Sequence, residues 1–153
     1  MTQVTSALIR FDWGASRTRR LINSALAWAG GMLWIGQYRG RKIYQIDSQT
    51  GAIFRTIDSN RFVTGVTWVD GDLWHATWED ETSELRRVDP QTGAILEQLE
   101  MLPGVIVSGL EFDGGDRFFC GGGSSGGVRA VRRPRRVFVT DSRSDGPVSS
   151  AGE

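Results

Sequence analysis

Short apolar and aromatic runs, each built around a tight-turn sequence, recur along the middle of this chain. The clearest run spans residues 65–74 and reads GVTWVDGDLW, and one similar run precedes it and another follows it. The aromatic markers of these runs lie 40 residues apart from Trp28 to Trp68 and 44 residues apart from Trp68 to Phe112. A repeat of this length is typical of the blades of a β-propeller.

Two turns divide each repeat into strands. Asp70 and Gly71 lie between two apolar runs, and this pair favours a tight hairpin because glycine takes a positive φ without strain. The sequence DPQTG at residues 89–93 predicts a second turn, and DSQTG occurs at the matching place, residues 47–51. The fold class is therefore all-β, with a β-propeller-type repeat. The strands of the central unit are predicted at residues 65–68, 73–78, 84–88 and 94–99.

The repeat accounts for about two and a half four-stranded blades within residues 23–136. The predicted blades span residues 24–62, 64–106 and 108–134. Residues 1–22 do not match the repeat and are assigned to a leader, and residues 137–153 are predicted to form a disordered tail because they are rich in Ser, Asp and Gly. Closed propellers usually contain four to eight blades, so we expect a partial propeller or one that self-association completes.

Charge and composition argue against several classes of function. The 153 residues carry 18 basic and 18 acidic side chains, and this balance does not favour nucleic acid or an anionic membrane as a partner. Arginines gather at residues 129–136, but a nucleic-acid interface is unlikely because stacking aromatics are not interleaved among them. The single Cys120 excludes an intrachain disulfide, and no long apolar segment or signal peptide is present, so we predict a cytoplasmic protein without membrane contact.

The glycine-rich tract at residues 121–126 matches two motifs that carry chemistry. It satisfies G-x-G-x-x-G, which binds dinucleotides, and G-x-S-x-G, which presents a nucleophilic serine. Both motifs require a following helix, whereas the next residues alternate like a strand. We interpret the tract as a loop between strands and expect no cofactor. The acids at residues 79–81 point in different directions along a strand or turn, so we expect a solvated loop there and no metal site.

The tryptophans divide into two groups by their place in the repeat. Trp28 and Trp34 correspond to Trp68 and Trp74, so we expect all four to pack between neighbouring blades. Trp78 has no tryptophan counterpart in the first blade. An aromatic side chain that breaks the repeat is a candidate for the wall of a pocket.

His75 is the only histidine of the chain and a candidate for catalysis. It lies in a predicted strand on the face that it shares with Leu73 and Thr77. Its ordinary pKa near neutrality would make it a ready general base. The alternative is a packed structural histidine, which is common on a strand.

The central unit resembles a known propeller family. Residues 62–67 (FVTGVT) and 71–78 (GDLWHATW) are similar to F-G-E-G-L-T and G-x-L-Y-Q-L-T-W of the plant and bacterial glutamine cyclotransferases, or glutaminyl cyclases. The resemblance covers about residues 24–122. Lactonase-like and streptogramin-lyase-like propellers are similar to the repeat at a greater distance.

The resemblance implies a site, and the sequence departs from it at the acidic position. Family members form pyroglutamate from N-terminal glutamine, and the acid implied for proton transfer is replaced here by Thr64. Ser24 and Ser108 occupy the matching positions of the other two units, and Trp78 matches the tryptophan of L-T-W. Losing a positioned acid-base group costs about 10²–10⁴ in rate. We therefore expect a binding or interaction domain that lacks cyclotransferase activity, with Ser24, Thr64, Trp78 and Ser108 lining its site.

Two alternatives stay open at this stage. The chain could be a cyclotransferase that uses another acid, such as Glu79, or a lactonase or lyase that uses His75. In each case the implied partner is a small molecule or a peptide, and no metal is required.

Overall fold

The computed structural model of the chain describes residues 23–135, and their strands form three antiparallel sheets. Sheet 1 contains β1 (Asn23–Ala29), β2 (Met32–Gln37), β3 (Lys42–Ile46) and β4 (Ile53–Asp58). Sheet 2 contains β5 (Phe62–Val69), β6 (Asp72–Glu79), β7 (Thr82–Val88) and β8 (Ile95–Glu100). Sheet 3 contains β9 (Gly109–Phe112), β10 (Arg117–Gly121) and β11 (Val128–Arg132).

In each sheet the strands follow one another in chain order, as in the blades of a propeller. Two sheets have four strands and the third has three, which confirms the prediction of an all-β, partial propeller. The predicted leader (1–22) and tail (137–153) lie outside the described residues. The glycine-rich tract joins β10 to β11 and contains one short 3-10 turn, η1 (Gly123–Ser125), so it is a loop between strands as expected.

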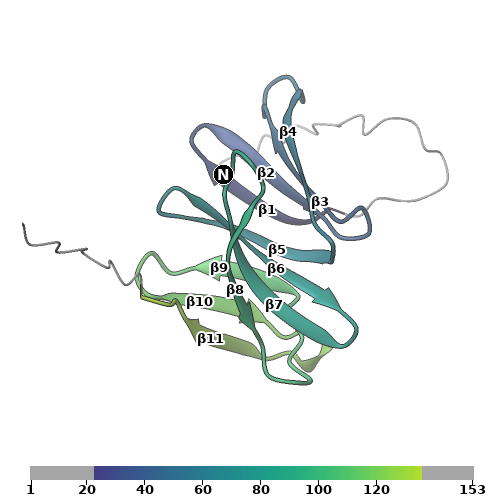
Figure 1. Cartoon of the computed structure of the whole chain (residues 1–153), viewed down its shortest axis with the longest axis vertical. Coiled ribbons are helices and arrows are strands. Elements are labelled where there is room, and N and C mark those ends of the chain that lie inside the picture. Colours follow the sequence, from purple (N-terminus) through teal and green to yellow (C-terminus); the bar gives the residue numbers. More distant parts are fainter. Residues whose placement is uncertain (1–22, 136–153) are drawn as a thin grey trace, which may run out of the picture.

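The sheets fan out from their first strands (Figure 1). Strand β5 contacts β1 on one side and β9 on the other, so these three strands are the innermost of their sheets. Strands β5 and β9 approach each other closely at Gly65, where an added Cβ would lie 2.7 Å from the Cβ of Leu110. Strands β1, β5 and β9 all begin at the same end of the sheets, and we call this end the site end.

Aromatic side chains fill the two spaces between sheets. Trp34 of sheet 1 stacks on Trp68 of sheet 2, with ring centroids 5.7 Å apart. Trp74 of sheet 2 lies 4.8 Å from Phe118 of sheet 3. Trp34, Trp68 and Trp74 therefore pack between blades as predicted, but the prediction for Trp28 is wrong, because this side chain is exposed on the outer face of sheet 1.

The predicted turns form at the end of the sheets opposite the site end. Asp70 and Gly71 have φ values of 49° and 89°, and both positions lie in the left-handed region that a two-residue hairpin requires. In the second turn, Asp89 accepts hydrogen bonds from the backbone N–H groups of Thr92 and Gln91, and these bonds lower the pKa of its carboxyl group. The sequence of each turn therefore specifies its geometry.

Candidate functional site

The three small hydroxyl residues predicted for the site lie where the inner strands begin. The Ser24 hydroxyl donates a hydrogen bond to the carbonyl oxygen of Val63 at 2.7 Å, which ties β1 to the residue before Thr64. Gly65, the residue after Thr64, contacts Gly109 and Leu110, which follow Ser108. The three positions therefore start neighbouring strands at one end of the fold.

The three hydroxyl groups have different surroundings. Thr64 is buried at a β-bulge, and its Oγ1 has no hydrogen-bond partner within residues 23–135. The Ser108 hydroxyl is exposed and accepts a hydrogen bond from the backbone N–H of Gly123 at 2.9 Å, so it is engaged by the loop of its own sheet. Ser24 spans sheets 1 and 2. Of the three, the Thr64 hydroxyl is the one that is left without a protein partner in the described part of the chain.

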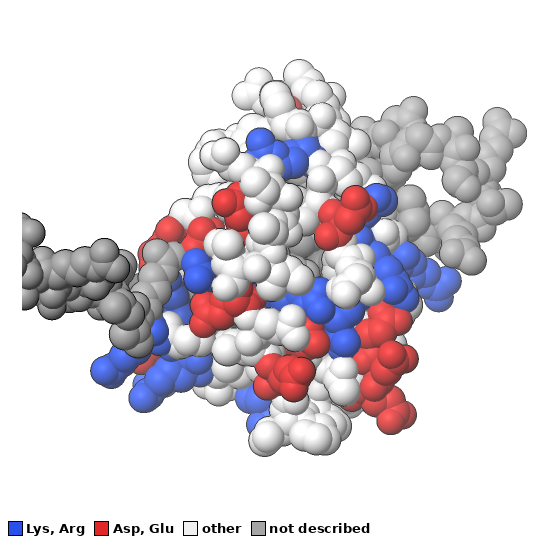
Figure 2. All heavy atoms as spheres, viewed as in Figure 1, with Lys and Arg blue, Asp and Glu red and all other residues white. Residues whose placement is uncertain are grey.

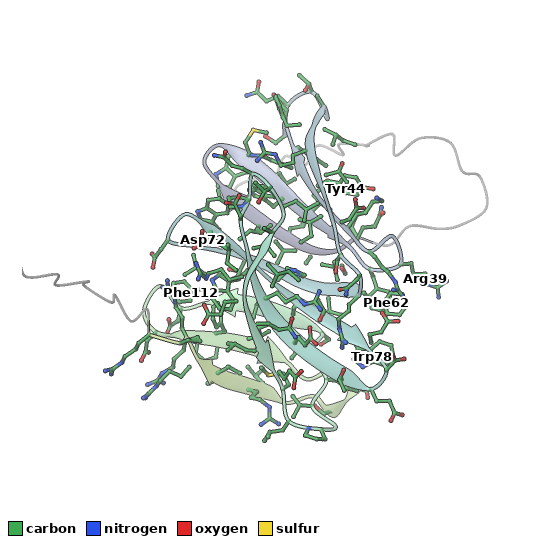
Figure 3. All side chains as sticks on the ribbon, viewed as in Figure 1. Arg39, Tyr44, Phe62, Asp72, Trp78 and Phe112 are labelled. Atoms are coloured by element: carbon green, nitrogen blue, oxygen red, sulfur yellow. The ribbon has the colours of Figure 1, made fainter. Side chains whose placement is uncertain are left out.

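Trp78 belongs to a ladder of aromatic rings at the site end. It pairs with Phe62 across β5 and β6, and their ring centroids are 6.2 Å apart; Figure 3 shows both along one edge of the molecule. Tyr38, in the turn between β2 and β3, also stacks on Phe62, with ring centroids 4.7 Å apart. The Arg41 guanidinium lies 4.5 Å from the Phe62 ring centroid, a distance that allows a cation–π interaction. The ladder thus joins sheets 1 and 2.

A groove of about 500 Å³ opens beside Trp78. One wall comes from the β8–β9 connection, with Pro103 and Ile106, and the rim carries Asp80 and Glu81. The indole Nε1 of Trp78 is buried and has no hydrogen-bond partner in the described ranges. Binding pockets combine apolar walls with a few polar groups that fix the orientation of the ligand, and this groove has both.

The acidic rim lies on a strained turn. Asp80 and Glu81 join β6 to β7 with φ values of 47° and 62°. The β1–β2 hairpin uses Gly30 and Gly31 at its two turn positions, with φ values of 59° and 73°. A residue other than glycine in a sparsely populated backbone region costs roughly 1–3 kcal/mol, and such residues cluster at ligand-binding and active sites.

Glu79, proposed as an alternative acid, is held by an ion pair. Its Oε1 accepts a hydrogen bond from the Arg41 guanidinium at 2.8 Å. Its Oε2 is buried and has no partner among the residues that the structure describes. In the sequence, Glu79 lies between Trp78 and Asp80, which both line the groove.

His75 lies apart from the groove residues. It is 2% exposed, and Arg86 lies opposite it on the neighbouring strand β7. Burial, with a smaller contribution from the charge of Arg86, lowers the pKa of His75 to about 3, so its imidazole is neutral near pH 7. Side chains alternate along β6, so His75 and Trp78 point to opposite faces of sheet 2. The geometry does not bring these two candidates into one site.

A buried ionic network was not predicted from the sequence. The Arg86 guanidinium lies 2.7 Å from a Glu84 carboxylate oxygen and donates a hydrogen bond to Asn60 Oδ1 at 2.6 Å. Arg61 lies 3.6 Å from the other Glu84 oxygen and donates to Thr77 Oγ1 at 3.1 Å. A signal was present, because Glu84 and Arg86 are two apart and therefore share one face of a strand. Asn60 and Arg61 lie on the connection between β4 and β5, where no strand periodicity indicates that they face Glu84 and Arg86.

No protein-family model and no curated protein sequence matches the chain. Among solved structures, it is similar to the glutaminyl cyclase of Myxococcus xanthus, with 16% identity, a TM-score of 0.55, and coverage of 69% of this chain and 46% of the other. It is also similar to the WD40 β-propeller domain of Doa1, with 23% identity, a TM-score of 0.50, and coverage of 65% and 32%. For Sqt1 of Saccharomyces cerevisiae the identity is 13% and the TM-score is 0.52, with coverage of 74% and 31%.

These similarities establish a β-propeller fold, and the chain spans less than half the length of each of these three solved chains. Within residues 23–135, no group of three or more His, Cys, Asp or Glu side chains is arranged to hold a metal ion. The same residues contain no helix that is long and apolar enough to cross a bilayer. Acidic and basic side chains are interspersed over the face of the molecule that Figure 2 shows.

Proposed function

We propose that this chain is a ligand-binding propeller domain and that its ligand occupies the groove beside Trp78. The observation that carries the proposal is the groove of about 500 Å³, which is lined by Trp78 and by the acidic residues Asp80 and Glu81. Tryptophan supplies a large flat apolar surface, which suits a ligand that has an apolar or aromatic part.

The rim of the groove suggests the charge of the ligand. Asp80 and Glu81 are exposed, and their carboxylates favour a cationic group, such as the free amine of a peptide. Pro103 and Ile106 offer apolar surface opposite the indole. A short peptide with a free N-terminus, or a small molecule with an ammonium group, therefore fits the groove.

We propose that binding occurs without cyclotransferase chemistry. Thr64 stands where the resemblance implies an acid, and a hydroxyl group does not transfer protons near neutral pH without an activating neighbour. His75 is buried, and its pKa of about 3 makes it a weak base. Glu79 is paired with Arg41. These three observations support a site that holds its ligand unchanged.

The second candidate function is a cyclotransferase that uses Glu79. It is favoured by the unpartnered Oε2 atom of Glu79, which could accept a proton. In that reaction the α-amine of an N-terminal glutamine attacks its own side-chain carboxamide carbon, and ammonia leaves. Ammonia release therefore distinguishes an enzyme from a binding domain.

Calorimetry with two peptides tests the proposal. The probes are Gln-Phe-Ala with a free N-terminus and the same peptide with an acetylated N-terminus. We expect the free peptide to bind more tightly, Trp78→Ala to abolish binding, and no ammonia to be released. Phe54→Ala is the matched control, because Phe54 is an exposed aromatic on the outer strand β4.

Any of three results would overturn the binding proposal. The first is that neither peptide binds, and the second is that binding survives Trp78→Ala. The third is steady ammonia release by the unmodified protein that Glu79→Gln abolishes, which would establish the enzyme instead.

A further inference from the structure

One repeat position carries an aromatic side chain that inserts between sheets. Trp34 on β2 and Trp74 on β6 occupy this position, and each is buried against the next sheet in the chain. Phe119 occupies the same position on β10. Each of the three aromatic residues pairs with the residue that precedes the aromatic marker of the inner strand, and these markers are Trp28, Trp68 and Phe112. Phe119 is 41% exposed. In sheets 1 and 2 the side chain at this position packs against the next sheet, whereas no further sheet follows sheet 3 among residues 23–135.

The opposite end of the fold exposes the matching surface. Trp68 on β5 receives Trp34, and Val66 on the same strand is buried beside it. The equivalent residues of β1 are Trp28 and Leu26, and each is 62% exposed. Other side chains of this face, Ile35, Tyr44 and Ile46, form a buried cluster. The exposed part of the face is therefore the strip formed by Leu26 and Trp28.

We propose that a second copy of this chain docks head to tail, with Phe119 of one copy packed against the Leu26–Trp28 strip of the other. The contact would repeat the interface that already joins sheets 1 and 2, with Phe119 in place of Trp34 and Trp28 in place of Trp68. An interface of this kind pairs two different surfaces and closes into a ring when the rotation between copies allows it.

Two copies suit the geometry of a closed propeller. Each chain contributes three sheets in the described residues, so a two-chain ring would contain six, within the usual range of four to eight. The ring would have two identical contacts. In each, Arg117, which shares a face of β10 with Phe119, would form part of a polar rim, as is common around an apolar interface core.

Two charge substitutions test the pairing. Light scattering after size exclusion should give the mass of two chains for the unmodified protein and of one chain for Trp28→Arg and for Phe119→Arg. Phe54→Arg is the matched control and should remain a pair, because Phe54 is as exposed as Trp28 but lies on the outer strand β4. Circular dichroism and thermal melting confirm that each variant folds.

Mixing the two variants is the decisive step. Phe119 of the Trp28→Arg protein can still meet Trp28 of the Phe119→Arg protein, so a two-chain species should form in the mixture alone. A symmetric contact of one surface with itself would be broken by one substitution and unaffected by the other. The proposal would be overturned if only one of the two substitutions broke the pair. It would also be overturned if the unmodified protein were a single chain at every concentration, or if the mixture stayed as single chains.

Discussion

Replacing Gly65 by alanine should separate the two inner strands that meet there. The new Cβ would lie 2.7 Å from the Cβ and 2.8 Å from the backbone nitrogen of Leu110, whereas carbon atoms in contact lie about 3.5–4.0 Å apart. Backbone cannot move aside like the end of a side chain, so β5 and β9 must shift apart by roughly 1 Å. Overpacking of this kind costs about 1–3 kcal/mol, a large part of a net stability of about 5–15 kcal/mol.

Gly109→Ala is the matched control for this substitution. Gly109 occupies the same repeat position on β9, but an added Cβ there meets nothing within 4 Å. Its unfolding free energy should change by less than about 0.5 kcal/mol. Urea unfolding followed by tryptophan fluorescence measures both variants, and the slope against denaturant should stay the same while the midpoint of Gly65→Ala falls. Equal midpoints for the two variants would refute the close contact between β5 and β9.

Two further predictions concern single side chains. The pKa of His75 falls from 6.5 in the unfolded chain to about 3 in the folded one, so between these values only the unfolded state binds the proton. The unfolding free energy should therefore drop as the pH falls below about 6.5, by up to about 1.4 kcal/mol per pH unit. Urea titrations at several pH values from 7.5 to 5 should show this dependence of the unfolding free energy on pH, and His75→Gln should remove it. Glu81→Gly should raise the unfolding free energy by about 1 kcal/mol through relief of its positive φ, and should weaken binding of the free-amine peptide; an unchanged or lower melting temperature would argue against strain at this turn.

Much of the fold follows from local sequence. The period of the aromatic markers and the Asp-Gly pair at residues 70–71 place the hairpins, because both signals depend on a few adjacent residues. The predicted strand at 73–78 agrees closely with β6, but the strand predicted at 65–68 is too short, since β5 begins at Phe62. The β-bulge at Thr64 allows the pairing to continue past the glycine, and periodicity does not report a bulge.

The candidate site was less accessible to prediction. Trp78 could be singled out because it breaks the repeat, but Pro103 and Ile106 lie on a connection outside the strand pattern, so their position across the groove depends on tertiary structure. The exposure of Trp28 was missed for a related reason. A repeat predicts equal surroundings for equivalent residues, whereas the first sheet has only one neighbouring sheet among residues 23–135.

Sheet 2 is the only sheet that contacts a neighbour on both faces in the described part of the chain, and this has a consequence for unfolding. Every backbone ladder closes within its own sheet, so one sheet can open without breaking the hydrogen bonds of the next. In proteins built from stacked repeats, the free energy of unfolding is roughly the sum of the stability of each repeat and of each interface between neighbouring repeats. In a variant that remains a single chain, amide protons of β5 and β6 should therefore exchange with solvent last, and those of β10 and β11 earlier, because unfolding begins at the two terminal sheets.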